Sequence, residues 1–287
     1  MDVIVSQFFE GIRNPFLNAV ASALTLFGEP IFMVVLICCV YWLVDKALGE
    51  RLALVTFTSM LVNASMKVAV KRTRPYVAGN VTRVEMDGLV DTVNLQPYES
   101  FPSGHSQISG GVAFGFATKQ RKIWVWIIAS LITLGVMWSR VYLGVHYLSD
   151  TLCGAALGVL FAFVWDILYR KAERYKYFIL VGFSVLAIVM MIFIPEKSMF
   201  EFAGMLLAGT ICLPIEEKFI GFENAKSWKH RLFRLLIGFA CVGVVFGAFS
   251  LLPFDFLEQI GWKFVKYFLT VATATLLVPF LYKKLKI

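Results

Sequence analysis

The sequence predicts an all-α protein that crosses a membrane several times, and three observations support this prediction. Hydrophobic residues make up 59% of the 287 residues, and charged residues only 16%. A soluble domain carries about a quarter charged residues. Apolar runs close to the length of a membrane-spanning helix recur along the whole chain. Because a water-soluble fold could not cover so much apolar surface, lipid must solvate part of it.

A helix that spans a bilayer needs about 20 mostly apolar residues. Nine segments approach this length, and we expect about nine transmembrane helices packed as a helical bundle. They lie at roughly 29–44, 52–70, 103–118, 123–143, 150–168, 177–194, 201–215, 235–252 and 264–282. The first and seventh are short, and the seventh, EFAGMLLAGTICLPI, carries a proline near its end.

Residues 4–26 predict a different kind of helix. Large apolar residues such as Phe8 and Phe16 are separated by polar positions, and Gly28-Glu29-Pro30 follows the segment. This pattern is typical of an amphipathic helix that lies in the membrane interface and is stopped by the glycine and the proline.

The basic residues indicate which side of the membrane each loop faces. Cytoplasmic loops are enriched in Lys and Arg, and with the amino terminus outside, 17 of the 27 basic residues fall in inner loops. These are Lys46, Arg51, Lys119, Arg121, Lys122, Arg170, Lys171, Arg174, Lys176, Lys218, Lys226, Lys229, Arg231, Arg234, Lys283, Lys284 and Lys286. We therefore expect an external amino terminus, an external loop at 71–102 and a cytoplasmic carboxyl terminus. The net charge of +8 then faces anionic lipid rather than nucleic acid.

Two of the three histidines lie at ends of apolar segments among other polar residues. His146 and Asp150 are four residues apart, so on a helix they would share one face. The carboxylate could then accept a hydrogen bond from one ring nitrogen and leave the other as a nucleophile. A helix-capping Ser149-Asp150 pair beside an incidental histidine is the alternative. The third histidine, His230, lies in a basic loop and is interpreted as solvated.

A second group of candidate residues ends the segment at 52–70. Lys67, Lys71 and Arg74 are spaced to share one helical face. Charges at membrane depth are costly and usually functional. The alternative is that basic residues at a helix end extend toward the headgroups, and this interpretation is stronger for Lys71 and Arg72 than for Lys67.

A third block, Pro102-Ser103-Gly104-His105, opens the helix predicted at 103–118. The first N–H groups of a helix have no partner inside it, and the helix dipole is positive there, so this turn could bind an anion. An ordinary Ser N-cap is the alternative.

Together, the three blocks occur in a fixed order: Lys67 with Arg74-Pro75, then Pro102-Ser103-Gly104-His105, then Ser139-Arg140 with His146 and Asp150. This arrangement resembles the three-part signature of the type 2 phosphatidic acid phosphatase superfamily. That group includes membrane lipid phosphatases, undecaprenyl-pyrophosphate phosphatases, glucose-6-phosphatase and vanadium haloperoxidases. Every signature position is matched, and the resemblance covers residues 60–160.

The resemblance implies a role for each matched residue. His146 would attack phosphorus, Asp150 would orient His146, and His105 would protonate the leaving oxygen and then activate water. The phosphate would be bound by five residues: Lys67, Arg74, Ser103, Gly104 and Arg140. Three cations can do the work of a metal ion, and the sequence offers no Asp/Glu/His cluster for one. We therefore expect no metal and no cofactor.

The expected activity is hydrolysis of a lipid phosphate or polyprenyl pyrophosphate on the extracytoplasmic side of a membrane, most simply a bacterial cytoplasmic membrane. A soluble ester such as a sugar phosphate is the alternative substrate. An anion transporter is disfavoured, because anion binding needs no oriented histidine. In this interpretation residues 1–287 form one membrane domain, with a phosphatase core at 29–194 and additional helices at 195–287.

Overall fold

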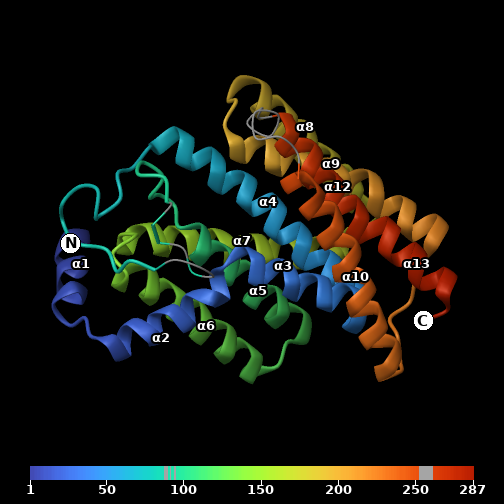
Figure 1. The fold of residues 1–287 in the computed structure, drawn as a ribbon, viewed down its shortest axis with the longest axis horizontal. Coiled ribbons are helices and arrows are strands. Elements are labelled where there is room, and N and C mark those ends of the chain that lie inside the picture. Colours follow the sequence, from blue (N-terminus) through green and yellow to red (C-terminus); the bar gives the residue numbers. More distant parts are fainter. Residues whose placement is uncertain (87–89, 91, 94, 252–260) are drawn as a thin grey trace. The chain divides into compact units, whose positions relative to one another are not determined.

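The structure is a computed structural model that describes residues 1–86, 90, 92–93, 95–251 and 261–287. These residues form helices and connecting loops (Figure 1), and they contain no strand. The chain divides into two compact units. Unit 1 comprises Met1–Leu36 and Val62–Ile167, and unit 2 comprises Ile37–Leu61 and Leu168–Ile287.

Unit 1 contains the amino-terminal helices and all three sequence blocks. Its elements are α1 (Asp2–Gly11), α2 (Pro15–Thr25), the 3-10 helix η1 (Leu26–Gly28), the first part of α3 (Pro30–Cys39), the end of α4 (Lys46–Val70), α5 (Gly104–Gln120), α6 (Ile123–Tyr142) and most of α7 (Leu148–Lys171).

Unit 2 contains the rest of α3, the first part of α4 and the carboxyl-terminal helices. Its further elements are the π-helix η2 (Val40–Val44), η3 (Glu173–Tyr175), α8 (Lys176–Phe193), α9 (Lys197–Ile215), the π-helix η4 (Glu216–Ile220), α10 (Trp228–Ala248), η5 (Phe249–Leu251), α12 (Gly261–Ala272), the π-helix η6 (Thr273–Leu277) and α13 (Val278–Leu285).

The amino-terminal segment forms two helices where the sequence predicted one over residues 4–26. The side chain of Asn14 caps α2 by accepting a hydrogen bond from the Leu17 N–H, and Pro15 occupies the first turn. Proline lacks the N–H that a continuous helix would need at this point and suits a first turn, so the helix restarts. The predicted stop at Gly28-Glu29-Pro30 is confirmed, because η1 ends at Gly28 and α3 begins at Pro30.

Close packing of α5 against α7 brings together the two helix ends that carry the histidine blocks. A Cβ added to Gly154 would lie 2.3 Å from the carbonyl oxygen of Ser103, and one added to Gly158 would lie 2.1 Å from that of Gln107. Only glycine permits such an approach. The Ser103 N–H then donates to the carbonyl of Asp150 over 3.0 Å. On another side of α5, Asn63 of α4 donates to the Gln107 side chain over 2.8 Å.

Unit 2 has an aromatic core and a group of paired charges. Its buried cluster consists of Tyr41, Trp42, Leu43, Phe222, Val278 and Tyr282. The Lys176 ammonium lies 3.1 Å from Glu50 and 3.4 Å from Glu217, and Lys46 pairs with Glu216. Because most of these side chains are buried, each charge requires the opposite charge beside it.

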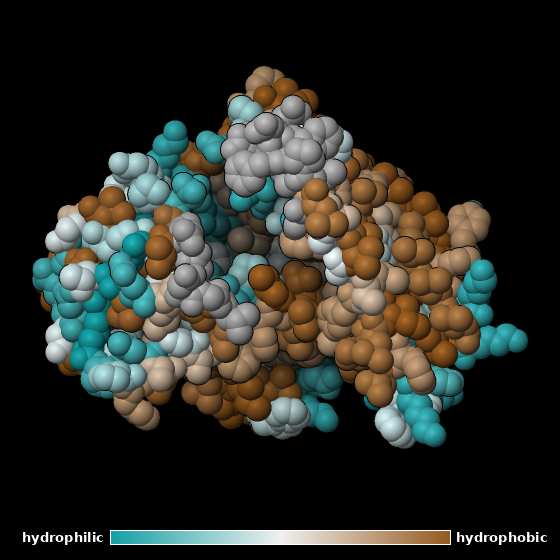
Figure 2. Space-filling model, viewed as in Figure 1, coloured by the Kyte–Doolittle hydropathy of each residue, from teal (hydrophilic) through white to brown (hydrophobic). Residues whose placement is uncertain are grey.

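The exposed surface of the helices is apolar, as expected for contact with lipid. Large apolar residues such as Ile123, Leu131, Phe178 and Val185 lie on the outer faces of α6 and α8 and are more than half exposed. In unit 1 the hydrophilic residues gather at the end where α1 lies, to the left in Figure 2.

Each of the nine segments predicted to span the membrane coincides with a helix among the described residues, namely α3 to α10 and α12. Seven described helices are long and apolar enough to cross a membrane, or eight if the bent pair of Pro15–Gly28 and Pro30–Val44 forms one span. The seven do not include α5, which has 17 residues. Residue 252, at the end of the segment predicted at 235–252, lies outside the described residues.

Candidate active site

The structure brings the eight predicted site residues together at one end of unit 1. Lys67 lies in the last turn of α4, and Arg74 follows in the loop. Ser103, Gly104 and His105 form the start of α5, while Arg140, His146 and Asp150 lie around the turn from α6 to α7. Arg74 joins the groups, because its N–H donates to the Pro97 carbonyl and its guanidinium reaches the Val145 carbonyl and His146.

His146 is buried and its ring is fixed at both nitrogens. Nδ1 lies 2.8 Å from the carbonyl oxygen of Ser100, which can only accept, so Nδ1 carries the hydrogen. Nε2 then carries the lone pair and accepts a hydrogen bond from Nη1 of Arg74 over 3.2 Å. Burial, followed by the positive charges of Arg74, Arg140 and Lys67, lowers the pKa of His146 well below its usual range. A neutral ring with a defined tautomer is the form that a nucleophile requires.

Asp150 does not hold His146 in the way that the sequence suggested. The expected shared helical face does not form, because α7 begins at Leu148 and His146 precedes it. Oδ2 of Asp150 lies 3.6 Å from Nδ1 of His146, beyond hydrogen-bond distance. It accepts instead from the Ser100 hydroxyl over 2.5 Å and from the Tyr147 N–H over 2.9 Å. Asp150 therefore positions Ser100, whose carbonyl positions His146.

Arg72 binds the second oxygen of Asp150, contrary to its interpretation as a residue that extends toward the headgroups. Its Nη1 donates to Oδ1 of Asp150 and to the Ser149 hydroxyl, each over 2.6 Å, and its Nη2 donates to Asp2 over 2.8 Å. The guanidinium also stacks over the Tyr147 ring, 4.3 Å from its centre. Sequence reasoning missed Arg72 and Asp2 because their partner segments are 70 or more residues away.

The prediction that Lys67, Lys71 and Arg74 share one helical face is wrong. Helix α4 ends at Val70, and Lys71 has a φ of 47°, in the left-handed region, so the chain turns there. Lys71 is exposed, whereas Arg74 is buried. Lys67 and Arg74 belong to the same site because of this turn.

The three predicted cations surround His146, and neighbouring groups fix them. Arg74 is held by three backbone carbonyls, those of Gln96, Glu99 and Val145, at 2.7–3.1 Å. Arg140 is fully buried and donates to the Thr25 hydroxyl over 3.0 Å. Lys67 lies 3.7 Å from the Glu99 carboxylate. Positive charges held in place beside a neutral histidine form a preorganised site for an anion.

The start of α5 is capped by Ser103, which was the alternative to an anion-binding turn at this position. The Ser103 side chain accepts from the Ser106 N–H, so it serves as an N-cap. His105 follows one residue into the helix, and its Nε2 lies 2.9 Å from Oε1 of Glu29. Sequence reasoning treated Glu29 only as part of a helix stop. The roles of Ser103 and Gly104 in phosphate binding stay predictions.

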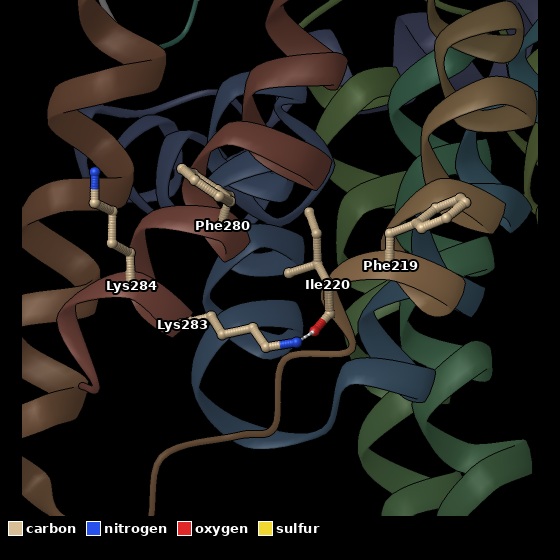
Figure 3. A pocket seen from close by; sticks show the side chains of 5 residues that line it. All are labelled: Phe219, Ile220, Phe280, Lys283 and Lys284. Carbon is tan, nitrogen blue, oxygen red and sulfur yellow. Dashed lines mark hydrogen bonds between the residues drawn. The ribbon is translucent and has the colours of Figure 1, made fainter.

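The described residues include no group of three or more His, Cys, Asp or Glu side chains placed to hold a metal ion. Two of the surface hollows among them are lined by no predicted site residue. One, of about 450 Å³ in unit 2, is bordered by Phe219, Ile220, Phe280, Lys283 and Lys284, and Lys283 donates to the Ile220 carbonyl (Figure 3). The other, of about 590 Å³, lies on the outer faces of α5, α6 and α7.

Comparison with known proteins relates this sequence to a family. A family model described as the PAP2 superfamily matches residues 50–174, and one described as the transmembrane extension of PAP2 superfamily phosphatases matches residues 200–287. The phosphatidylglycerophosphatase B of Bacillus subtilis (strain 168) is 32% identical over 189 residues, which cover 61% of this chain and 86% of that protein.

A second relative and one solved structure are also similar. The lipid A 4'-phosphatase of Bacteroides thetaiotaomicron is 30% identical over 166 residues, covering 55% of this chain and 72% of the relative. A crystal structure of a transmembrane PAP2-type phosphatidylglycerolphosphate phosphatase from Bacillus subtilis matches with a TM-score of 0.49 and 31% identity, covering 61% of this chain and 87% of that one. The length and identity of the sequence matches, together with the three ordered blocks, establish that this chain belongs to the PAP2 superfamily of membrane phosphatases.

Proposed function

We propose that this chain hydrolyses a lipid phosphate or a polyprenyl pyrophosphate through a phosphohistidine at His146, on the extracytoplasmic side of its membrane. The observation that carries the proposal is the state of His146. Its Nδ1–H donates to Ser100 and its Nε2 lone pair lies beside Arg74, and burial and the nearby cations lower its pKa, which favours the neutral ring.

The reaction has two steps. In the first, Nε2 of His146 attacks phosphorus, an N–P bond forms, and the P–O bond to the lipid breaks as His105 gives a proton to the leaving oxygen. In the second, His105 takes a proton from water, the water oxygen bonds to phosphorus and the N–P bond breaks. Lys67, Arg74 and Arg140 stabilise the three phosphoryl oxygens, since phosphoryl transfer depends mostly on positioning and charge.

The class of substrate is supported by the relatives, which are named for phosphatidylglycerophosphate and for lipid A. A phosphate-release panel in detergent tests it, with polyprenyl pyrophosphate, phosphatidate, phosphatidylglycerophosphate, sphingosine phosphate and glucose 6-phosphate. We expect release from at least one lipid and much less from glucose 6-phosphate. Preference for glucose 6-phosphate would favour a soluble ester and refute the lipid assignment.

The covalent step is tested by rapid acid quench and detection of phosphohistidine. His146→Ala should form no phosphoenzyme and release no phosphate. His230→Ala is the matched control, because His230 is an exposed histidine on α10 in unit 2. His105→Ala should form phosphoenzyme from a nitrophenyl phosphate, whose leaving group needs little protonation, and should then stall. Phosphate on His105 with His146 unmodified would reverse the two roles.

The side of the membrane is tested by labelling with an impermeant thiol reagent in intact cells, in a variant that lacks the five native cysteines. Ala78 lies in the loop after α4 and Lys226 precedes α10, and both are exposed. Ala78→Cys should react and Lys226→Cys should not. The opposite result would place catalysis on the cytoplasmic side.

A further inference from the structure

The turn between η1 and α3 is fitted tightly against the start of α5. A Cβ added to Gly28 would lie 2.8 Å from the carbonyl oxygen of His105 and 2.9 Å from its Cβ, so glycine is required for this contact. The next residue, Glu29, is held by its backbone, since its N–H donates to Leu26 and its carbonyl accepts from Met33. This fixed turn places the Glu29 carboxylate 2.9 Å from Nε2 of His105.

The charges that face His105 come from several elements. Lys67 extends from α4 and Arg140 from α6, and His146 lies between α6 and α7. The two cations repel a proton on the His105 ring, because like charges in a poorly solvated site disfavour each other. The carboxylates are divided among partners: Glu99 lies beside Lys67, Asp150 binds Arg72, and Glu29 contacts His105.

A general acid must carry a proton in the resting enzyme. The cations around His105 disfavour a proton on its ring. The negative charge of Glu29, at hydrogen-bond distance from Nε2, favours that proton. A carboxylate on one ring nitrogen also fixes which nitrogen keeps its hydrogen during the reaction. Both effects act on the same step, the protonation of the leaving oxygen.

We propose that Glu29 is a positioning residue for this phosphatase: its charge favours the protonated form of His105 against the surrounding cations, and it holds the Nε2–H, so that Nδ1 alone exchanges protons with the reacting groups. This inference rests on the proposed function of His105. In the first step Nδ1–H passes its proton to the leaving oxygen, and the ring becomes neutral with hydrogen on Nε2. In the second step the Nδ1 lone pair takes a proton from the attacking water, which restores the starting state.

In both histidines, an acceptor on one ring nitrogen determines which nitrogen reacts. The Ser100 carbonyl holds the hydrogen of His146 on Nδ1 and frees Nε2 for attack, whereas Glu29 holds the hydrogen of His105 on Nε2. Ser100 is a neutral acceptor, which suits a nucleophile that must stay uncharged. Glu29 is anionic, which suits an acid that must start charged.

Glu29→Gln tests the proposal, because glutamine keeps the size and an acceptor oxygen but removes the charge. With a lipid ester, the rate of phosphohistidine formation at neutral pH should fall about 10–100-fold, up to the lower end of the about 10²–10⁴-fold that general acid catalysis contributes. With a nitrophenyl phosphate the same step should fall less than about 3-fold, because that leaving group needs little protonation. The pH above which kcat/KM for the lipid ester declines should move down by about one unit.

Glu29→Asp serves as the conservative variant, since it keeps the charge on a shorter side chain, and it should restore most of the wild-type pH profile. Glu85→Gln is the control for loss of a carboxylate, because Glu85 is 73% exposed and pairs with Arg83. An equal loss on both substrates with an unchanged pH profile would overturn the proposal, and so would wild-type behaviour of Glu29→Gln. Neither result touches the proposed phosphohistidine at His146, which is refuted separately if His146→Ala still releases phosphate.

Discussion

Replacement of Arg72 by glutamine should disable the catalytic site without touching a residue of the three sequence blocks. The guanidinium of Arg72 joins Asp150, Ser149 and Asp2, and Asp150 is fully buried. Glutamine removes the positive charge and can keep at most part of these contacts. The buried carboxylate then loses its charged partner, and the Ser100 carbonyl that fixes His146 loses its support.

The size of the effect follows from the geometry. Two unit charges about 4 Å apart interact by about 4 kcal/mol at an effective dielectric constant near 20. The Arg72 side chain is 29% exposed, so solvent screening reduces this to about 2 kcal/mol. If the loss appears in the transition state, it corresponds to a decrease of about 30-fold in kcat/KM. KM should change little, because Arg72 contacts Asp150 rather than the proposed phosphate position.

The assay is phosphate release from a lipid ester, together with the rate of phosphohistidine formation. Lys71→Gln is the matched control, since Lys71 is the adjacent basic residue and is exposed. Arg72→Lys should be intermediate, because an ammonium keeps the charge but lacks the planar fork that reaches several acceptors. If Arg72→Gln were as active as Lys71→Gln, the argument that Arg72 and Asp150 position His146 would be refuted.

Three further predictions follow from the same site. Activity should persist in a chelator and be inhibited by vanadate, which mimics the phosphoryl transition state; loss in the chelator that magnesium restores would contradict this. Because the pKa of His146 is lowered from 6.5, protonation inactivates the nucleophile only at lower pH, so the acid limb of kcat/KM for a nitrophenyl phosphate should lie below pH 6.5; a limb at or above 6.5 would contradict the neutral nucleophile. Burial raises the pKa of Asp2, but hydrogen bonds from Ser149 and Arg72 and the charge of Arg72 together outweigh it and lower the pKa from 3.8. A lowered pKa means stability that is present above pH 3.8 and lost as the pH falls. The melting temperature of Asp2→Asn in detergent should therefore lie below that of the wild type at neutral pH and converge with it in acid, and a difference that is independent of pH would disprove the assignment.

The helices of this protein could be predicted from sequence because hydropathy is a local property. Each of the nine apolar segments coincides with a helix, and the stop at Gly28-Glu29-Pro30 is where the sequence placed it. The break before Pro15 was also readable in principle, since Asn14-Pro15 is a typical helix start. It was missed because the apolar pattern continues across it.

The eight candidate site residues could be named from sequence because they fall in three ordered blocks that resemble a family signature. Their contacts could not be derived from helical spacing. His146 and Asp150 do not share a helix, because His146 precedes α7. Lys67 and Arg74 do not share one either, because Arg74 follows the end of α4. Spacing rules apply only within a continuous helix, and these residues lie at its ends.

The partners that fix the catalytic groups are determined by the tertiary structure alone. Asp2 contacts Ser149 across 147 residues, Arg72 contacts Asp150 across 78, and Glu29 contacts His105 across 76. A single Asp, Arg or Glu near a helix end has many possible partners in the sequence, and nothing local selects among them. The choice is made when α5 packs on α7 and the η1 turn fits against His105, because burial leaves each charge only the opposite charge that lies within reach.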